Sequence, residues 1–345
     1  MTTSTIRRAI ATSVDTVELV DAPTPIPGAG EVSIRMLVSG ICGSDLHAVA
    51  GHHPWMTLPI ALGHEVVGAV DAVGDGVTGI EVGARVTVEP TLPCRDCKQC
   101  RRGNVNICEN LSFLGCGAPQ GALADSFTIR ADRVQMLDEA MSDLDAVLIE
   151  PLATPCHAVR LAAGDEGSLA GRTIVVIGAG TIGQFVLAAV QDRGADRVVV
   201  VDPMDSKREL AVRRGAEAAF DSAGDVVAAI RAYFGESADF VFDCVAIEPT
   251  ISQAVRLCDR AGIVALVGVP ARDVVVPVQL LQDRQIRLQG CATYLSEDYA
   301  AATRIIAGGG VTAADFISAE FPLADLDAAF TAARDPQTVK VVVHP

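Results

Sequence analysis

TIVVIGAGTIG, residues 173–183, decides the fold class of this chain. Its first five residues form a nearly continuous apolar run, which is typical of a buried parallel strand. The next six follow the pattern G-x-G-x-x-G and open a helical stretch that extends to about Arg193. Because a strand precedes the glycines and a helix follows them, this stretch predicts a turn that binds the pyrophosphate of a dinucleotide.

Each glycine of this turn has its own predicted role. Gly178 permits the tight turn, Gly180 lets the backbone approach a pyrophosphate, and Gly183 allows close packing of helix on strand. The helix begins at Thr181 and Ile182, and this end offers free N–H groups and a partial positive charge. These five residues are therefore the predicted contacts to the phosphates.

An aspartate at the end of the next apolar run predicts which dinucleotide binds. Asp202 follows the run 198–201, and a carboxylate there accepts hydrogen bonds from the adenosine ribose and repels a 2′-phosphate. NAD is therefore predicted over NADP. Lys207 and Arg208 follow closely and could weaken the preference for NAD over NADP. The alternative interpretation of Asp202 is an aspartate that only caps a turn.

Strands and helices alternate through this half of the chain. The predicted order is a strand at 198–201, a helix near 206–214, a strand at 240–243, a helix near 250–258 and a strand at 263–267. Such alternation predicts a doubly wound parallel sheet, and hence an α/β fold.

The first 150 residues have a different pattern. Short β-branched runs such as 32–38, 66–70 and 84–88 are broken by glycine and proline, which is typical of a mainly β domain. The first 30 or so residues carry too little pattern for an assignment, and the last fifty-odd are mixed. We therefore expect a first domain over 1–150, a dinucleotide-binding domain over 151–288 and a return to the first domain over 289–345.

Four cysteines between about residues 90 and 110 predict a structural metal site. They follow the spacing C-x2-C-x2-C-x7-C, at Cys94, Cys97, Cys100 and Cys108. Four thiolates so close in sequence can reach one tetrahedral zinc ion at about 2.3 Å each and leave no open coordination position. Disulfides and an iron–sulfur cluster are the alternatives that the spacing leaves open.

Composition and charge argue against several classes of partner. The length of 345 residues suggests about two domains. A net charge of −16 repels a polyanion, which argues against nucleic acid. The start, MTTSTIRRAI, has no apolar signal region, and no run of 18 apolar residues occurs, so we expect neither secretion nor a membrane span. Ten cysteines then favour reduced thiols and metal binding in the cytoplasm.

A second set of ligand-type residues is dispersed along the chain. Cys42 and His64 are well separated, Glu65 adjoins His64, and Glu150 comes much later. Cysteine, histidine and glutamate are ligands of catalytic zinc sites that keep one position open. Spacing alone does not join these residues, because a single cysteine is more often a buried apolar thiol and a single glutamate is usually exposed.

Several motifs, taken in order, resemble the zinc-dependent medium-chain dehydrogenases. They are GICGSDLH at 40–47, GHE at 63–65, the four-cysteine segment, EPLA at 150–153, GAGTIG at 178–183 and KVVV at 340–343. EPLA is similar to the polyol branch, which contains sorbitol, L-idonate and threonine dehydrogenases. The resemblance covers nearly the whole chain and implies a Rossmann domain, a mainly β GroES-like catalytic domain, two zinc ions per chain and NAD.

The resemblance also implies roles for individual residues. Four match the ligands of the catalytic zinc, namely Cys42, His64, Glu65 and Glu150. Ser44 matches the hydroxyl that takes the substrate proton, His47 the end of the proton relay, and Asp45 the residue that orients the histidine ligand. Thr154 matches a nicotinamide contact. The backbone segment beside the carboxamide matches Val267, Gly268 and Val269.

The implied reaction is hydride transfer between a secondary alcohol and NAD, giving a ketone. Polyols and sugar acids are substrates of the branch, but Thr293 stands where sorbitol-type members have an arginine, and Ala48 where a tyrosine is common. Both changes remove polar contacts and leave a cyclic or terpenoid-like alcohol as an alternative. Trp55 and Tyr294 are the predicted substrate contacts.

Other expectations follow from the same resemblance. Family members are dimers or tetramers, so we expect a homo-oligomer that acts on a small molecule. A non-catalytic relative, like the related lens crystallins, is the alternative of another class. Independently of the resemblance, the remaining thiols and one further histidine are expected to have packing roles, namely His157, Cys156, Cys116, Cys244, Cys258 and Cys291.

Overall fold

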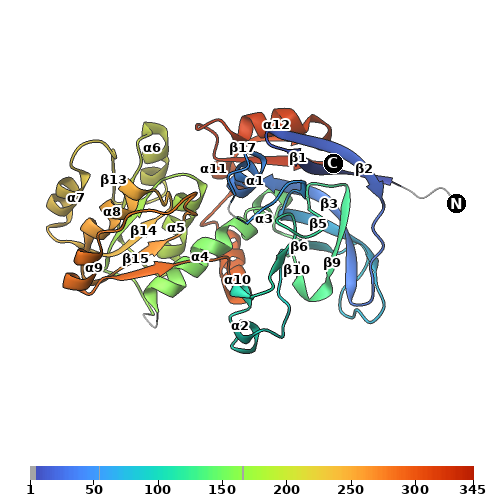
Figure 1. The fold of residues 1–345 in the computed structure, drawn as a ribbon, viewed down its shortest axis with the longest axis horizontal. Helices are drawn as coiled ribbons and strands as arrows, with labels where there is room; N and C mark the ends of the chain where they lie inside the picture. Colours follow the sequence, from blue (N-terminus) through green and yellow to red (C-terminus); the bar gives the residue numbers. More distant parts are fainter. Residues whose placement is uncertain (1–4, 54, 165–166) are drawn as a thin grey trace. The chain divides into compact units, whose positions relative to one another are not determined.

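The computed structural model describes residues 5–53, 55–164 and 167–345 and divides the chain into two compact units (Figure 1). Unit 1 consists of Met1–Pro151 and Val311–Pro345, and unit 2 of Leu152–Gly310. Helix α4 (Ile149–Ala163) begins at the end of unit 1 and continues into unit 2. The candidate zinc ligands all lie in unit 1, whereas the glycine turn lies in unit 2.

The largest sheet of unit 1 has seven strands. They are ordered β10-β6-β5-β3-β18-β17, and β9 also pairs with β3. Their bounds are β3 (Glu31–Ile41), β5 (Glu65–Val73), β6 (Arg85–Val88), β9 (Ser126–Arg130), β10 (Val134–Met136), β17 (Ile317–Pro322) and β18 (Lys340–His344). Apolar side chains of these strands, among them Ile34, Met36 and Phe127, are fully buried in one core. The mainly β character predicted for this part is confirmed.

Two smaller sheets belong to the same unit. β1 (Thr5–Ser13) lies between β2 (Thr16–Pro23) and β4 (Ile60–Ala61), and β7 (Thr91–Leu92) pairs with β8 (Ser112–Phe113). The first 30 or so residues carry too little pattern to predict β1 and β2. Most of their side chains are half-buried, which explains why their sequences alternate so weakly between apolar and polar residues.

The helices of unit 1 are short. They are α1 (Gly43–Val49), α2 (Lys98–Arg101), α3 (Asp143–Ala146), α11 (Ala313–Phe316) and α12 (Leu326–Ala333), with 3-10 turns at η1 (Val105–Ile107), η2 (Ala131–Arg133) and η3 (Leu323–Asp325). Helix α12 packs against β17 and β18 and contributes Leu326 and Phe330 to the core. Helix α1 follows β3 directly, and this junction carries the first candidate metal ligand, Cys42.

Unit 2 contains the predicted parallel sheet. Its six strands are ordered β13-β12-β11-β14-β15-β16, and every neighbouring pair is parallel. Their bounds are β11 (Thr173–Ile177), β12 (Arg197–Val201), β13 (Ala218–Phe220), β14 (Ala238–Asp243), β15 (Cys258–Leu266) and β16 (Arg287–Gly290). All five residues of β11 are buried, as its apolar run predicts. The α/β fold class is therefore confirmed.

Helices α5 to α9 connect these strands in unit 2, and α10 follows the last strand, β16 (Figure 1). Their bounds are α5 (Thr181–Asp192), α6 (Asp205–Arg213), α7 (Val226–Phe234), α8 (Glu248–Leu257), α9 (Val278–Arg284) and α10 (Ser296–Ala307). The predicted return to the first domain at residue 289 is too early, because unit 2 continues to Gly310. The reason is that β16 pairs with β15 and α10 packs against α5.

A buried polar network joins α4 and α10 within unit 2. His157 Nδ1 lies 2.8 Å from Asp298 Oδ2, and Arg160 Nε lies 2.6 Å from Asp298 Oδ1. Burial alone would raise the pKa of Asp298, but the hydrogen bonds from Arg160 and His157 lower it to about 2. His157 was expected only to pack, yet it is part of a hydrogen-bonded network that links the two helices.

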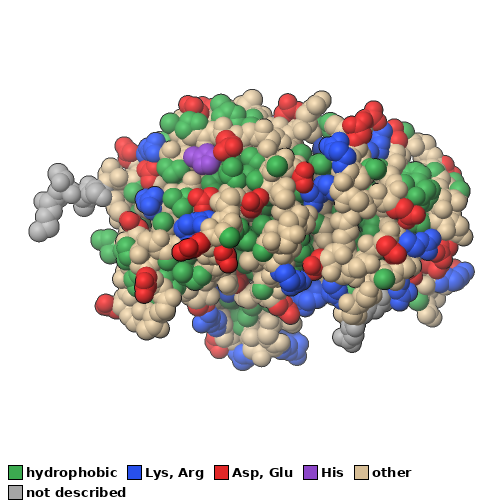
Figure 2. Space-filling model, turned by 180° about the vertical axis from the view of Figure 1, so that it is seen from behind, with side chains coloured by type: hydrophobic (Ala, Val, Ile, Leu, Met, Phe, Trp, Pro, Cys, Tyr) green, Lys and Arg blue, Asp and Glu red, His purple; other side chains and the backbone are tan. Residues whose placement is uncertain are grey.

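The molecular surface carries charges of both signs. On the face shown in Figure 2, acidic and basic side chains are interspersed, with apolar side chains scattered between them. Over the whole sequence, 43 acidic side chains outnumber 27 basic ones. Among the described helices, none combines the length and hydrophobicity that a membrane crossing requires.

Candidate functional site

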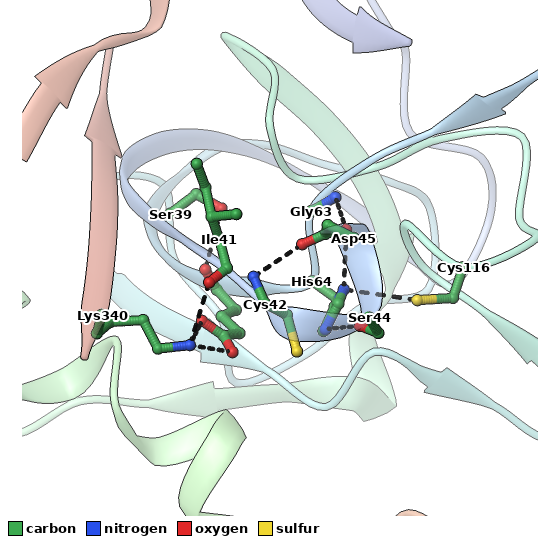
Figure 3. Close-up of polar contacts among 10 residues, drawn as sticks. Ser39, Ile41, Cys42, Ser44, Asp45, Gly63, His64, Cys116 and Lys340 are labelled. Carbon is green, nitrogen blue, oxygen red and sulfur yellow. Dashed lines mark hydrogen bonds and ion pairs between the residues drawn. The ribbon is translucent and has the colours of Figure 1, made fainter. Parts of the chain in front are cut away.

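The junction between β3 and α1 presents Cys42. This residue is the N-cap of α1, and its backbone N–H donates a 3.0 Å hydrogen bond to Asp45 Oδ2. The other oxygen of the same carboxylate, Oδ1, accepts a 3.3 Å hydrogen bond from the Gly63 N–H (Figure 3). Asp45 is completely buried. One carboxylate therefore fixes the backbone at Cys42 and the backbone immediately before His64.

Three candidate ligands converge at this point. One ligand atom from each of Cys42, His64 and Glu65 can be chosen so that all lie within 4.8 Å of one another. His64 and Glu65 are buried and Cys42 is half-buried. The structure thus brings together residues that spacing alone did not join. Glu150 is buried but is not a member of this group.

The imidazole of His64 has neighbours on several sides. Ser44 Oγ lies 3.4 Å from Nε2, and Cys116 Sγ lies 3.5 Å from Nδ1. Asp45 Oδ1 is 3.7 Å from Nδ1, which is beyond an ordinary hydrogen bond. Asp45 thus lies beside the ring and also holds the backbone next to both candidate ligands, and its role in orienting His64 stays a prediction. Cys116, expected to be a core thiol, is a neighbour of the site that sequence reasoning missed.

The charges around His64 favour a cation. Burial alone lowers the pKa of His64, yet the nearby Cys116, Asp45 and Cys42 raise it well above its usual value. Surroundings that favour a positive imidazole also favour a metal cation. Thiolate and imidazole are ligands that zinc prefers, so this donor set fits a zinc ion.

Lys340 is a second residue of the site without an assigned role in the sequence analysis. Its Nζ lies 2.7 Å from each carboxylate oxygen of Glu65 and donates to the Ile41 carbonyl at 3.3 Å (Figure 3). Burial alone lowers the pKa of Lys340, but the charge of Glu65 offsets this effect and the pKa is raised. A lysine inside the otherwise apolar run 339–343 was the available signal, since a buried ammonium requires a partner.

Glu65 and Lys340 meet across the middle strand β3. Gly40 pairs with Glu65 of β5 on one side and with Val342 of β18 on the other. A Cβ on residue 40 would lie only 2.0 Å from Glu65 Oε2. The glycine therefore leaves the space through which the two side chains form their ion pair.

The four predicted cysteines form a separate cluster. One sulfur from each of Cys94, Cys97, Cys100 and Cys108 lies within 4.8 Å of the others. Cys108 Sγ is 3.4 Å from Cys94 Sγ and 3.8 Å from Cys97 Sγ. Four sulfurs bound at about 2.3 Å around a tetrahedral zinc would be about 3.8 Å apart, so the cluster fits the ion.

Backbone amides surround the sulfurs of this cluster. Cys94 Sγ accepts a hydrogen bond from the Cys97 N–H at 3.4 Å, and Cys97 Sγ accepts one from the Cys100 N–H at 3.4 Å. Hydrogen bonds from the backbone of Asp96 and Cys97 lower the pKa of Cys94 to about 6. All ten cysteines of the chain are free thiols. The disulfide alternative is therefore not what the structure shows.

The glycine turn in unit 2 has the geometry that its sequence predicts. Gly178 has φ +88°, in the left-handed region that glycine tolerates. A Cβ on Gly183 would lie 1.7 Å from the Gly178 carbonyl oxygen, so α5 can start close to β11 only with glycine there. Beside the turn is a cavity of about 300 Å³ at the carboxyl ends of β11, β12 and β14, lined by residues that include Gly178, Asp202 and Thr250.

Asp202 is held in this cavity by backbone amides. Its Oδ2 accepts from the Ala179 N–H at 2.8 Å and its Oδ1 from the Met204 N–H at 2.9 Å. Arg208 donates to the Asp202 carbonyl at 2.6 Å and forms an ion pair with Asp205. The guanidinium of Arg208 is thus already engaged, whereas the Asp202 carboxylate lies in the wall of the cavity.

The remaining predicted contacts are located as follows. Thr154 lies in α4 and is half-buried. Val267, Gly268 and Val269 follow β15, and the N–H groups of Val267 and Gly268 donate to the Asp243 carbonyl at 2.9 and 3.0 Å. Trp55 is 77% exposed. Tyr294 is only 2% exposed and its ring lies 5.7 Å from that of Tyr299, so the structure places it in packed surroundings rather than on an open surface.

A metal site on a mainly β unit and a dinucleotide turn on a parallel sheet define the class of metal-dependent dehydrogenases. Comparison with known families agrees with this class. Residues 28–139 match the alcohol dehydrogenase GroES-like domain, and residues 181–308 match the zinc-binding dehydrogenase domain.

Individual relatives cover nearly the whole chain. A 2-dehydro-3-deoxy-L-galactonate 5-dehydrogenase of Pseudoalteromonas atlantica is 34% identical over 323 residues, 92% of each chain. D-xylulose reductase A of Aspergillus oryzae is 28% identical over 95% of this chain and 93% of its own length. A Sinorhizobium meliloti protein assigned as a zinc-binding dehydrogenase, solved with NADP, is 29% identical with a TM-score of 0.92 and covers 99% of this chain and 100% of its own.

This chain belongs to the zinc-binding alcohol dehydrogenase family. It is therefore an oxidoreductase that acts on a small molecule with zinc and a nicotinamide dinucleotide as cofactors. The family resemblance seen in the sequence is confirmed, as is the expectation of an enzyme.

Proposed function

We propose that this enzyme oxidises a secondary alcohol of the polyol or sugar-acid type to a ketone with NAD, using zinc held by Cys42 and His64. The convergence of Cys42, His64 and Glu65 beside Ser44 is the observation that carries this proposal. When bound, zinc supplies Lewis acidity toward an alcohol oxygen and the nicotinamide accepts the hydride. Relatives named for a galactonate derivative and for xylulose support the substrate class.

The chain's own residues hold and move the substrate proton. Ser44 Oγ lies 3.4 Å from His64 Nε2 and would take the proton of a substrate hydroxyl at this site. His47 follows three residues later in α1, and because of this spacing it lies on the same face of the helix as Ser44. The side chain of His47 is exposed. We infer that the proton passes from Ser44 toward His47 and then to water.

The other site residues have supporting roles in this proposal. Glu65, which is paired with Lys340, would be a carboxylate available to ligate the zinc, and Glu150 would act on the zinc through a water molecule. In unit 2, we propose that Gly178, Gly180, Thr181, Ile182 and Gly183 contact the pyrophosphate. Thr154 and 267–269 are proposed to contact the nicotinamide, and Lys207 the adenosine end. Trp55 is the proposed substrate contact in unit 1.

Asp202 is the basis for preferring NAD. Asp202→Ala is expected to lower kcat/KM with NAD by about tenfold or more, because hydrogen bonds to a charged group contribute about 1.5–3 kcal/mol. The value of kcat/KM with NADP should fall less, since the substitution also removes the repulsion of the 2′-phosphate. The measurement is the ratio of kcat/KM for the two cofactors, with Asp259→Ala, an exposed aspartate at the opposite end of the sheet, as control. If the ratio of kcat/KM for NAD and NADP did not change, residues other than Asp202 would determine the cofactor preference.

A substrate screen and metal analysis test the proposed function together. The screen offers polyols, sugar acids, diols and cyclic secondary alcohols with NAD, while zinc is counted per chain. Two zinc ions and NAD reduction with a polyol or sugar acid support the proposal. Activity confined to cyclic or terpenoid-like alcohols would favour the alternative suggested by Thr293 and Ala48. One zinc per chain and no NAD reduction with any of these alcohols would contradict the proposed function.

We also propose that the enzyme is a cytoplasmic homodimer or homotetramer. Ten free thiols support a reducing compartment. Light scattering of the purified protein at several concentrations tests the oligomeric state.

A further inference from the structure

We propose that Asp243 is a positioning residue for the dinucleotide, which acts through the loop 244–247 between β14 and α8. This inference rests on the proposed function, because residues of the loop line the cavity that is assigned there to NAD. Asp243 itself is completely buried and does not line the cavity. Any effect of this carboxylate on NAD must therefore pass through the groups that it holds.

The carboxylate of Asp243 holds the loop by hydrogen bonds. Its Oδ1 accepts the N–H groups of Val245 and Ala246 at 2.9 and 3.0 Å. Its Oδ2 accepts the hydroxyl of Thr250 in α8 at 2.8 Å, and Thr250 Oγ1 in turn accepts the Ile247 N–H at 3.1 Å. Two side chains thus fix three consecutive N–H groups of the loop.

One residue of the loop has an unfavourable backbone conformation. Ala246 has φ +57°, in the left-handed region that favours glycine, and it is buried. A residue with a Cβ keeps such a conformation only where its surroundings enforce it, and these positions cluster at ligand sites. The hydrogen bond from the Ala246 N–H to Asp243 supplies part of that enforcement. The carboxylate therefore holds the loop in a shape that it would not adopt by itself.

The loop packs against two other parts of the proposed dinucleotide site. A Cβ on Gly178 would lie 2.6 Å from Cγ2 of Val245, so this valine leans on the phosphate-binding turn. A Cβ on Gly268, in the segment proposed for the nicotinamide, would lie 2.9 Å from the carbonyl carbon of Val245 and from Cβ of Ala246. The Gly268 N–H also donates to the Asp243 carbonyl at 3.0 Å. A change in the loop is therefore felt at both contacts.

The first test compares Thr250→Val, which removes the hydroxyl but keeps the branched shape, with Thr250→Ser, which keeps the hydroxyl. The readout is the Kd of NAD, measured by calorimetry on the full-length, zinc-loaded protein without substrate. Thr250→Val should raise this Kd about tenfold, the usual effect of one lost hydrogen bond to a charged group. Thr250→Ser should bind NAD like the wild-type protein.

A second pair of variants tests Asp243 directly. Asp243→Asn keeps an oxygen for the two loop N–H groups and has an amide that can donate to Thr250 Oγ1, so NAD affinity should stay near the wild-type value. Asp243→Ala removes every one of these bonds and should raise the Kd at least as much as Thr250→Val. If Asp243→Ala does not fold, the Thr250 variants still decide the question.

Thr173→Val is the matched control for a general loss of stability. At the start of β11, at the opposite end of the same sheet, Thr173 Oγ1 donates to Asp239 Oδ2 and accepts the Asp239 N–H, both at 3.1 Å. This arrangement resembles that of Thr250 but lies away from the cavity. Thr173→Val should lower the free energy of unfolding to a similar extent and leave the Kd of NAD unchanged.

Three results would overturn the inference. They are an unchanged Kd in Thr250→Val, an equal rise in Thr250→Val and Thr250→Ser, and an equal rise in Thr250→Val and Thr173→Val. The last result would mean that lost stability, and not the shape of the loop, weakens binding. A wild-type protein that does not bind NAD would instead contradict the proposed function, so the two failures are distinguishable.

Discussion

Replacement of Cys42 by alanine is expected to abolish turnover and to leave NAD binding nearly unchanged. Cys42 contributes the thiol of the Cys42–His64–Glu65 group, and its removal leaves too few soft ligands for a zinc site. We expect kcat/KM to fall by about three orders of magnitude or more, which corresponds to about 4 kcal/mol of lost transition-state stabilisation. The glycine turn and Asp202 belong to unit 2, so the dinucleotide site keeps its structure.

Three measurements check this prediction. Steady-state kinetics should show the loss of turnover. The zinc content should fall from two ions to one per chain, and calorimetry should give the same NAD affinity as for the wild-type protein. Cys258→Ala is the matched control, since it removes a thiol far along the sequence from the candidate ligands. If Cys42→Ala retained turnover, the assignment of Cys42 as a ligand of the catalytic zinc would be wrong.

The second large effect is expected from Lys340→Met. The substitution removes the ammonium group but leaves the Glu65 carboxylate, which is completely buried, without its cationic partner. Breaking a buried ion pair in this way costs about 3–5 kcal/mol of the free energy of unfolding. Chemical denaturation of the zinc-loaded protein measures the change.

Two further variants separate the ion pair from a general effect of the substitution. Lys98→Met, at an exposed lysine of α2, should change the free energy of unfolding by no more than about 0.5 kcal/mol. The double variant Glu65→Gln/Lys340→Met should be more stable than Lys340→Met, because it no longer buries an unpaired charge. If Lys340→Met were as stable as the wild-type protein, the ion pair would not be a stabilising element of the site.

Much of unit 2 is predictable because its signals are local. The run 173–177 is buried between neighbouring strands, and its continuous apolar residues predict this burial. The glycines that follow are required by contacts within the same turn, such as the approach of Gly183 to the Gly178 carbonyl. The predicted boundary at 289 failed because pairing of β16 and packing of α10 are decided by neighbours distant in sequence.

The four-cysteine cluster is predictable for the same reason, since its sulfurs come from one short segment. The candidate metal centre differs, because its residues converge from separate strands and loops. Family resemblance joined Cys42 to His64, whereas the residues themselves carried no signal of their proximity. Lys340 and Cys116 were missed, because their partners Glu65 and His64 lie 275 and 52 residues away.

By itself, the sequence determined the parallel sheet, the phosphate-binding turn and the four-cysteine cluster, because each depends on residues that are close along the chain. Only the tertiary structure decided which polar groups surround His64 and Glu65. β3 lies between β5 and β18, and Gly40 leaves the gap in which Glu65 meets Lys340. Gly115, packed on Gly63, likewise places Cys116 beside His64. Buried charges and ring nitrogens require partners, and only packing determines which residues can reach them.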